Sequence, residues 1–265
     1  MLSVALIITT YNWPEALNHC LHSVLQQSHR LNQIIIADDG SSEHTKLLID
    51  SWQSRLPINH QWQADEGFRA ARCRNLALSQ VESDYVICID GDMILHPDFV
   101  MDHMRFAKPA TFVQGSRVLL SEAFTNQLFD KPIHWQWPPD GIEHGVKGNR
   151  KNLIQKPWLS RLIGLQRRCC AKNTRTCNMA FWLDDLRAIN GFDNRYEGWG
   201  REDSDLAWRL VHYGVKRRRI KFSGIALHMY HSEVSRDSLL ANDLLLQYVL
   251  KHPSYYRCKD GLDEV

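Results

Sequence analysis

Three short apolar runs constrain the fold more than any other feature of this chain. Residues 4–8, 34–37 and 85–89 are rich in Ile and Val, and no polar side chain interrupts them. A strand of this kind is covered on both faces, as the strands of a parallel sheet are. Each run is far shorter than the ~20 residues of a membrane-spanning helix. The runs therefore predict buried strands of one sheet.

Helical segments lie between these strands. Asn12 and Pro14 suit the start of a helix, and apolar residues then recur at helical spacing. Further helices are expected at residues 43–54 and 67–78, with a short strand near residues 58–62. The alternation predicts an α/β fold with a Rossmann-like, open, twisted, mostly parallel sheet and helices on both faces. Ligands of such sheets bind beyond the carboxyl ends of the strands.

The triplet Asp90-Gly91-Asp92 directly follows the third apolar run. Two carboxylates separated by Gly bring oxygen donors to one hard cation with little bulk between them. Mg²⁺ or Mn²⁺ held there would bridge the two phosphates of a nucleotide sugar. Taken alone, the triplet is also an ordinary turn sequence.

A second acidic motif occupies residues 198–205, Gly-Trp-Gly-Arg-Glu-Asp-Ser-Asp. Trp199 is suited to a platform for the apolar face of a sugar, and the acids open a helix expected at residues 202–213. Alternatively, Asp203 or Asp205 caps that helix and Trp199 belongs to the core. The presence of both acidic motifs in one predicted sheet favours catalysis.

The order of these motifs resembles that of family 2 glycosyltransferases of the GT-A fold. Besides the two acidic motifs, the resemblance rests on residues 8–12 (Ile-Thr-Thr-Tyr-Asn), residues 37–41 (Ala-Asp-Asp-Gly-Ser) and Arg74-Asn75. Residues 199–205 also resemble the chondroitin polymerase and β-1,4-galactosyltransferase type. The matching segments cover most of residues 3–107 and 177–232.

The resemblance implies one GT-A domain over residues 1–265. Its expected parts are a nucleotide-sugar-binding half at 1–107, an acceptor and catalytic half at 108–232 with a flexible loop near 132–173, and a C-terminal helix and tail at 233–265. We expect residues 147–172 of the loop to become ordered on donor binding and to help form the acceptor site.

Roles for individual residues follow from the resemblance. The residues expected at the nucleotide sugar are Thr9, Tyr11, Asp39, Arg74, Asp90 and Asp92. Of these, Asp39 would accept a hydrogen bond from a uracil-type base, and Arg74 would lie near the nucleotide or its phosphates. Asp203 corresponds to the catalytic base, and Glu202 would touch acceptor or donor hydroxyls.

The expected metal site is also taken from the resemblance. Asp92 is the direct ligand, and Asp90 lies near the ribose and the metal. Residues 227–231, Leu-His-Met-Tyr-His, correspond to the segment that supplies a histidine; His231 fits that position better, and His228 is the alternative. Imidazole nitrogen suits Mn²⁺ better than Mg²⁺, so we expect Mn²⁺, with Mg²⁺ as the second choice. Both histidines could instead form hydrogen bonds at a strand end.

The implied activity is an inverting, metal-dependent, non-processive transfer of a hexose or N-acetylhexosamine. The donor would be a UDP-sugar and the acceptor a hydroxyl of a glycan or glycolipid of bacterial lipopolysaccharide core or capsule. Processive synthases carry a QxxRW motif, whereas the nearest string here is Gln166-Arg167-Arg168-Cys169. An Asp203 pKa near the ordinary ~3.9 would suffice if positioning matters more than basicity.

Two rival functions remain open from the sequence. A sugar-nucleotide nucleotidyltransferase also uses a parallel sheet and metal-binding carboxylates, but residues 9–14 lack its Gly- and Arg-rich phosphate loop. A non-catalytic nucleotide-sugar or glycan-binding protein would keep the sheet without turnover. The presence of Asp90, Asp92 and Asp203 argues against the latter.

The composition limits the classes of partner and the cellular location that we expect. The 32 Lys and Arg and 30 Asp and Glu give a net charge of +2, too balanced to indicate nucleic acid. Two segments, 216–221 and 147–172, are rich in basic residues. Both segments could face phosphate-rich partners or anionic lipid. Alternatively, the first is a strand edge and the second a loop, and both face solvent. Without a spanning stretch or a leader, we expect a cytoplasmic protein that also touches the cytoplasmic face of the inner membrane. The seven Cys are expected to be reduced thiols.

Overall fold

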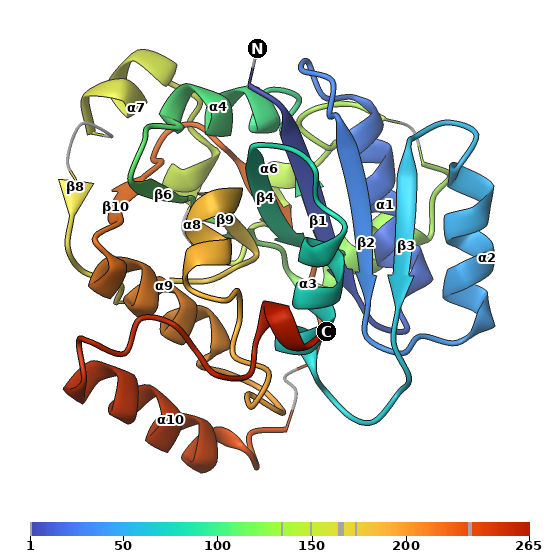
Figure 1. The fold of residues 1–265 in the computed structure, drawn as a ribbon. Helices are drawn as coiled ribbons and strands as arrows, with labels where there is room; N and C mark the ends of the chain where they lie inside the picture. The colour runs from blue at the N-terminus through green and yellow to red at the C-terminus, as the bar shows by residue number, and fades with distance from the viewer. Residues whose placement is uncertain (1, 134, 149, 164–166, 173, 233–234) are drawn as a thin grey trace.

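The computed structural model describes residues 2–133, 135–148, 150–163, 167–172, 174–232 and 235–265. Within them, two sheets organise the chain (Figure 1). The large sheet has the strand order β3 (Ile58–Trp62), β2 (Gln33–Asp38), β1 (Val4–Thr10), β4 (Tyr85–Asp90), β9 (Asn178–Trp182), β6 (Thr111–Gln114), β10 (Lys216–Arg219) and β8 (Arg167–Arg168). The small sheet has the order β5 (Met93–Leu95), β11 (Ala226–His228) and β7 (Val118–Leu119).

The large sheet is mostly parallel, as predicted. Strands β3, β2, β1 and β4 run parallel, and β10 runs parallel to β6. Strand β9 is antiparallel to both β4 and β6. The register pairs Thr10 with Asp38 and Thr9 with Asp90. The carboxyl ends of β1, β2 and β4 therefore meet at one edge of the sheet, and the polar residues that follow them come together.

Helices cover both faces of the large sheet, because both sets of side chains along its central strands are apolar. Leu6 and Ile8 of β1 pack on the face that carries α1 (Pro14–Leu25), α2 (Glu43–Trp52) and α4 (Phe99–Phe106). Ala5 and Ile7 pack on the opposite face. That face carries α3 (Ala70–Ser79), α8 (Leu183–Ala188) and α9 (Glu202–Tyr213). Both sets of side chains are completely buried, which explains why apolar and polar residues do not alternate along these strands.

Two helix starts differ from the predictions. Asn12 does not cap α1; its side-chain oxygen accepts a hydrogen bond from the Ser42 backbone at 2.8 Å, which joins the loops after β1 and β2. Helix α3 begins at Ala70, because Gly67 adopts a φ of 85° that a helix does not allow. Helix α9 ends as predicted at Gly214, whose φ is 105°.

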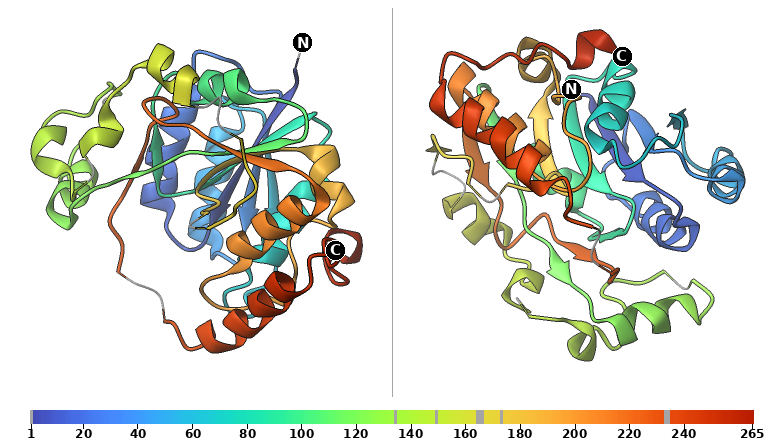
Figure 2. Two further views of the ribbon diagram at one scale, coloured as in Figure 1. Left: turned by 90° about the vertical axis from the view of Figure 1, so that its left-hand side faces the viewer. Right: turned by 90° about the horizontal axis from the view of Figure 1, so that it is seen from below.

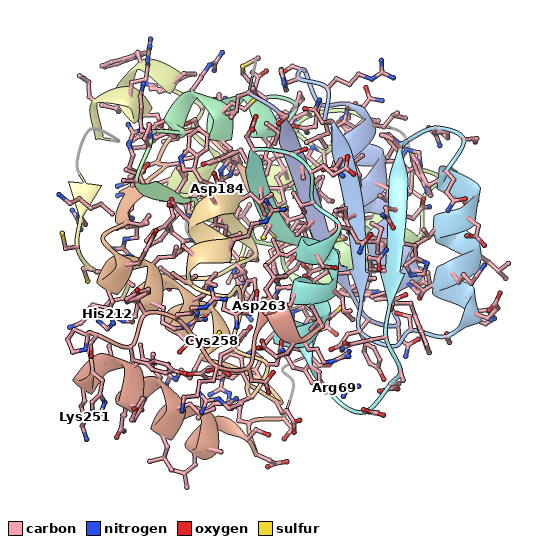
Figure 3. All side chains as sticks on the ribbon, in the orientation of Figure 1. Arg69, Asp184, His212, Lys251, Cys258 and Asp263 are labelled. Carbon is pink, nitrogen blue, oxygen red and sulfur yellow. The ribbon has the colours of Figure 1, made fainter. Side chains whose placement is uncertain are left out.

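The C-terminal region consists of one helix and a returning tail. Helix α10 (Leu239–Lys251) begins later than the expected residue 235, and residues 233–234 lie outside the described part. The tail, with η2 (Leu262–Glu264), returns to the centre of the molecule, where Figure 3 labels Cys258 and Asp263. There Asn190 donates to the Cys258 carbonyl at 3.1 Å and accepts from the Asp263 backbone at 2.8 Å. The tail is thus part of the folded domain.

The segment 132–173 is not the structureless loop that the sequence suggested. It follows α5 (Glu122–Phe129) and contains α6 (Ile142–Gly145), η1 (Arg150–Leu153) and α7 (Pro157–Ile163). Ile142 packs with Phe124 of α5 and with residues of the small sheet in a third apolar cluster. Figure 2 shows α5 to α7 gathered to one side of the large sheet. These helices were missed because each is only about one or two turns long.

The basic run 216–221 fits the expectations only in part, because Lys216, Arg219 and Lys221 are exposed whereas Arg217 and Arg218 are not. Strand β10 lies between β6 and β8, so it is not an edge strand. Arg217 and Arg218 are buried and donate to the backbone carbonyls of Lys172 and Phe106. These two guanidinium groups therefore hold backbone in place and are not free to bind a phosphate-rich partner.

Two further predictions concern the whole chain. None of the helices in the described residues is long and apolar enough to cross a bilayer. The seven cysteines are all unpaired, as expected for reduced thiols.

Candidate active site

A cavity of about 810 Å³ lies at the carboxyl ends of β1, β2 and β4, between the start of α9 and the end of β11. The residues that the sequence analysis assigned to the nucleotide sugar, the metal and catalysis all line this cavity. They are Thr9, Tyr11, Asp39, Arg74, Asp90, Asp92, Glu202, Asp203, His228 and His231. Residues from both ends of the chain thus share one site, as the order of motifs implied.

Asp39 is fixed at one end of the cavity. Its carboxylate accepts hydrogen bonds from the Arg69 backbone at 2.8 Å and from the Gln63 side chain, and its own N–H donates to the Thr10 carbonyl at 3.0 Å. Burial raises the pKa of Asp39 above its ordinary value. Figure 3 labels Arg69 on the loop before α3. The carboxylate is therefore held rigidly at the cavity wall.

The turn after Asp39 needs glycine. Gly40 has a φ of 97°, and a Cβ at this position would lie 2.6 Å from the Asp65 backbone. Asp65 also accepts a hydrogen bond from the Tyr11 hydroxyl at 2.9 Å. Tyr11 remains 48% exposed, so its ring is available to a ligand in the cavity.

Arg74 of α3 connects three elements under the cavity floor. Its guanidinium group donates to Thr9 of β1 at 3.1 Å and to Glu202 of α9 at 3.1 Å, and lies 3.4 Å from an Asp90 oxygen of β4. Arg74 and Glu202 are both buried. This network joins the nucleotide half of the sequence to the acidic motif of α9, and it holds the Glu202 carboxylate in a fixed orientation.

Asp203 is a partly buried carboxylate in the first turn of α9. It does not cap the helix: Arg201 occupies the N-cap position with a φ of 83°, and no side chain caps α9. Burial and the neighbouring Glu202 charge raise the pKa of Asp203 to about 7. The sequence did not indicate this rise of the pKa, because it does not show that Glu202 and Asp203 are enclosed together.

Asp205 has a different, structural environment. Its carboxylate is fully buried and accepts from Arg209 at 2.6 Å and from the Tyr196 hydroxyl at 3.4 Å. Asp205 does not line the cavity, and it does not cap the helix either.

Asp92, His228 and His231 form a group suited to a metal ion. Their potential ligand atoms all lie within 4.8 Å of one another. The Asp92 carboxylate is 3.2 Å from Nε2 of His228 and 3.6 Å from Nε2 of His231. The structure thus brings both candidate histidines to Asp92. Strand pairing explains this: His228 lies opposite Met93, and the Met229 N–H donates to the Asp92 carbonyl at 3.0 Å.

The chemistry of this group fits a divalent cation. The second carboxylate oxygen of Asp92, Oδ1, is buried without a hydrogen-bond partner. Burial and the Asp90 charge raise the pKa of Asp92 well above its ordinary value, which a bound cation would offset. Burial and the nearby Arg117 charge lower the pKa of His228 to about 3, so its imidazole is neutral and able to coordinate. One carboxylate and two imidazoles suit Mn²⁺ better than Mg²⁺.

Trp199 lies at the cavity rather than in the core. Its ring is 41% exposed, and the Arg236 guanidinium lies 5.1 Å from the ring centroid. Asn242 of α10 is buried and donates to the carbonyls of Glu197 and Gly200, each at 3.0 Å, on either side of this residue. Helix α10 thereby holds the Trp199 loop against the site.

Several cavity residues were not found by sequence reasoning. Asp65, Arg117, Arg175 and Arg236 all line it. They stand in no recognisable motif, and their positions depend on loops whose course only the structure shows. None of the described residues in 147–172 lines the cavity, although that segment was expected to form the acceptor site.

Comparison with known proteins identifies the family. The model of glycosyl transferase family 2 matches residues 5–158, and that of the N-terminal domain of galactosyltransferase matches residues 165–232. The chain therefore belongs to glycosyl transferase family 2. This confirms the resemblance seen in the sequence motifs.

Curated relatives are distant and longer. The chain is 24% identical to hyaluronan synthase of Pasteurella multocida, with 87% of this chain and 24% of the relative aligned. It is 24% identical to chondroitin synthase of Escherichia coli, over 98% of this chain and 40% of the relative. With validoxylamine A glucosyltransferase of Streptomyces hygroscopicus it shares 25% identity, over 95% of this chain and 61% of the relative. The chain thus spans less than two thirds of each of these proteins.

Solved structures share the fold. TarS of S. aureus in complex with UDP-GlcNAc has a TM-score of 0.64 at 13% identity, covering 94% of this chain and 66% of that one. A fragment of TarS without the ligand gives a TM-score of 0.63 at 14% identity, covering 94% and 65%. The predicted GT-A fold is therefore confirmed.

Proposed function

We propose that this chain is an inverting, metal-dependent, non-processive glycosyltransferase. It transfers a hexose or N-acetylhexosamine from a UDP-sugar to a hydroxyl of a glycan or glycolipid acceptor. The observation that carries the proposal is one cavity that holds both a partly buried carboxylate of raised pKa, Asp203, and a metal-binding group, Asp92 with two histidines. Membership of the family and the relatives that act on sugars support it.

Each half of the cavity has a separate task in this proposal. Asp39 accepts a hydrogen bond from the base, and Thr9 and Tyr11 also contact the nucleoside. Asp90 lies near the ribose and Arg74 near the phosphates, where it also holds Glu202. Asp92, His228 and His231 would hold Mn²⁺, which supplies positive charge beside the diphosphate when bound.

Asp203 carries the proton transfer. Its carboxylate takes the proton of the acceptor hydroxyl as that oxygen bonds to C1 of the donor sugar, and the bond from C1 to the diphosphate breaks on the opposite face. A single displacement of this kind inverts the anomeric centre. Glu202, fixed by Arg74, hydrogen-bonds to sugar hydroxyls and keeps the pKa of Asp203 high. Trp199 offers its exposed ring to the acceptor sugar.

The raised pKa of Asp203 predicts a pH dependence. A base must be unprotonated, and Asp203, with a pKa of about 7, gains its proton as the pH falls through that value. The transfer rate at saturating acceptor should therefore fall about tenfold per pH unit below about 6 and level off above about 8. A rate profile measured with UDP-sugar and Mn²⁺ from acid to alkaline pH checks this. A profile that stays flat down to pH values near 5 would contradict the role of the pKa shift.

One experiment tests the function itself. Purified protein is incubated with UDP-Glc, UDP-Gal, UDP-GlcNAc or UDP-GalNAc, Mn²⁺ and a panel of bacterial glycan acceptors. Release of UDP together with a product of higher mass supports a transferase. Release of UTP from a sugar phosphate would indicate a nucleotidyltransferase instead, and binding without turnover would indicate a non-catalytic protein.

We further propose a cytoplasmic setting at the membrane surface, in lipopolysaccharide core or capsule synthesis. Residues 144–183 contain nine Lys and Arg and no Asp or Glu. Within this stretch, Trp158 and Leu162 stand one turn apart on α7 and are 65% and 58% exposed. An exposed aromatic and aliphatic pair within a sequence segment rich in cations suits the interface of an anionic bilayer.

The membrane contact predicts a loss of vesicle binding in one double variant. Trp158→Ser with Leu162→Ser should reduce co-sedimentation with vesicles of phosphatidylglycerol and phosphatidylethanolamine by about tenfold or more, since each buried apolar side chain contributes about 1.5–3 kcal/mol. Leu244→Ser is the matched control, because Leu244 of α10 is also exposed, at 61%, but lies outside the basic segment. Equal losses in the two proteins would contradict a specific role for α7.

A further inference from the structure

Two arginines, Arg117 and Arg175, line the cavity together with the candidate metal ligands Asp92, His228 and His231. Arg117 immediately precedes β7, which pairs in parallel with β11 so that Val118 lies opposite Leu227. The same register pairs Leu119 with His228, so Arg117 lies two residues along the chain from the partner of His228 in the small sheet. Neither arginine belongs to a motif that the sequence analysis recognised.

Arg117 lacks the partners that other enclosed arginines have. Its Nε is buried without a hydrogen-bond acceptor, and its Nη1 has only the Cys177 sulfur, a weak acceptor, at 3.6 Å. In contrast, Arg74 pairs with two carboxylates and Arg209 pairs with Asp205. No ion pair joins Arg117 or Arg175 to a carboxylate within the described ranges. A cation that lines a cavity without a carboxylate partner is suited to bind an anion that enters the cavity.

The charges around the metal site have both signs. The candidate ligands comprise one carboxylate, Asp92, and two histidines, and Asp90 and Arg117 line the same cavity. Arg117 lines the same cavity as Asp92, and its positive charge would repel a divalent cation bound there. A diphosphate carries at least two negative charges, so it would pair with the metal cation and with both arginines at once.

We propose that Arg117, with Arg175 beside it, binds the diphosphate of the donor and makes metal binding dependent on that diphosphate. The inference rests on the proposed function, since it assigns residues to the leaving group of the same reaction. Two opposite effects follow for Arg117→Gln. The affinity for the diphosphate falls because an acceptor loses its guanidinium partner, whereas the affinity for metal alone stays the same or rises because a repelling charge is removed.

Binding measurements separate these effects without any turnover. Calorimetric titration with UDP in the presence of Mn²⁺ should show a loss of affinity of about tenfold to a hundredfold in Arg117→Gln, the range expected for a hydrogen bond to a charged group. Uridine affinity should change less than about twofold. Electron paramagnetic resonance titration of Mn²⁺ without nucleotide should show equal or tighter binding in the variant. Arg55→Gln is the matched control, because Arg55 is exposed in the turn after α2, stacks on Trp52 and does not line the cavity.

Several outcomes would overturn the proposal. They are an unchanged affinity for UDP in Arg117→Gln, an equal loss for uridine, or weaker binding of Mn²⁺ alone. If Arg117→Gln does not fold, Arg117→Lys replaces it in the test, because Lys keeps the positive charge. Arg117→Lys should retain part of the UDP affinity. If the wild-type protein bound no UDP, the proposed function would fail by itself. Inorganic pyrophosphate with Mn²⁺ would then be the probe, and only its loss in the variant would support the role of Arg117.

Discussion

Asp203→Asn is expected to reduce sugar transfer by about 10²–10⁴-fold while leaving UDP and Mn²⁺ binding unchanged, because the substitution removes the proton acceptor and little else. Asn has nearly the same size, and Asp203 makes no cap that the fold needs. Its raised pKa of about 7 also means that the negative charge of Asp203 makes folding less favourable. The variant should therefore have a melting temperature at least as high as that of the wild type. The transfer rate, UDP affinity and melting temperature are measured together.

Asp184→Asn is the control for this prediction. Asp184 is an exposed residue of α8, labelled in Figure 3, and it does not line the cavity. Its substitution should leave transfer within about twofold, as is usual for surface changes. Near-normal transfer by Asp203→Asn would refute its role as the base, and the search would move to Glu202, which lies beside it in the cavity.

Asp92→Ala should abolish metal-dependent UDP binding. Loss of residues that merely orient metal ligands typically costs 10–100-fold in metal affinity, so loss of the only carboxylate in the group should exceed about 100-fold. The raised pKa shows that folding disfavours the ionised carboxylate. Such a group destabilises the protein above its ordinary pKa, so its removal should not lower the melting temperature at neutral pH. Calorimetry of UDP with Mn²⁺ and thermal melts check both parts.

Histidine variants and a surface control refine this test. His228→Ala and His231→Ala should each weaken Mn²⁺-dependent UDP binding if both coordinate, and a loss in only one would identify the single ligand. Asp50→Ala on α2 is the control, since Asp50 is exposed and pairs only with Lys46. UDP affinity that remains dependent on Mn²⁺ in Asp92→Ala would rule out this metal site.

The fold could be predicted in outline because the apolar runs are continuous. Residues of β1 face two buried layers, so the pattern of residues 4–8 reports a parallel strand covered on both faces. The predictions that failed concern individual residues. Asn12 has the chemistry of a cap but bonds to Ser42, and Arg217 and Arg218 are charged but buried against backbone carbonyls. Tertiary contacts decided these positions, and a sequence pattern does not contain them.

The site could be predicted where residues stand in motifs at strand and helix ends. Asp90, Asp92 and Asp203 all line the cavity because the sheet brings those ends together. The pKa of Asp203 could not be predicted, because it depends on enclosure next to Glu202. Arg117 could not be found either, because only the fold brings it into the cavity that also holds His228.

The most direct measurement of the central claim is transfer from UDP-sugars in the presence and absence of Mn²⁺. The account predicts that at least one of UDP-Glc, UDP-Gal, UDP-GlcNAc and UDP-GalNAc yields UDP and a glycosylated acceptor with inverted anomeric configuration. Chelation of the metal and Asp203→Asn should each abolish the product. Transfer that continues undiminished after chelation, or a product with retained configuration, would contradict the account.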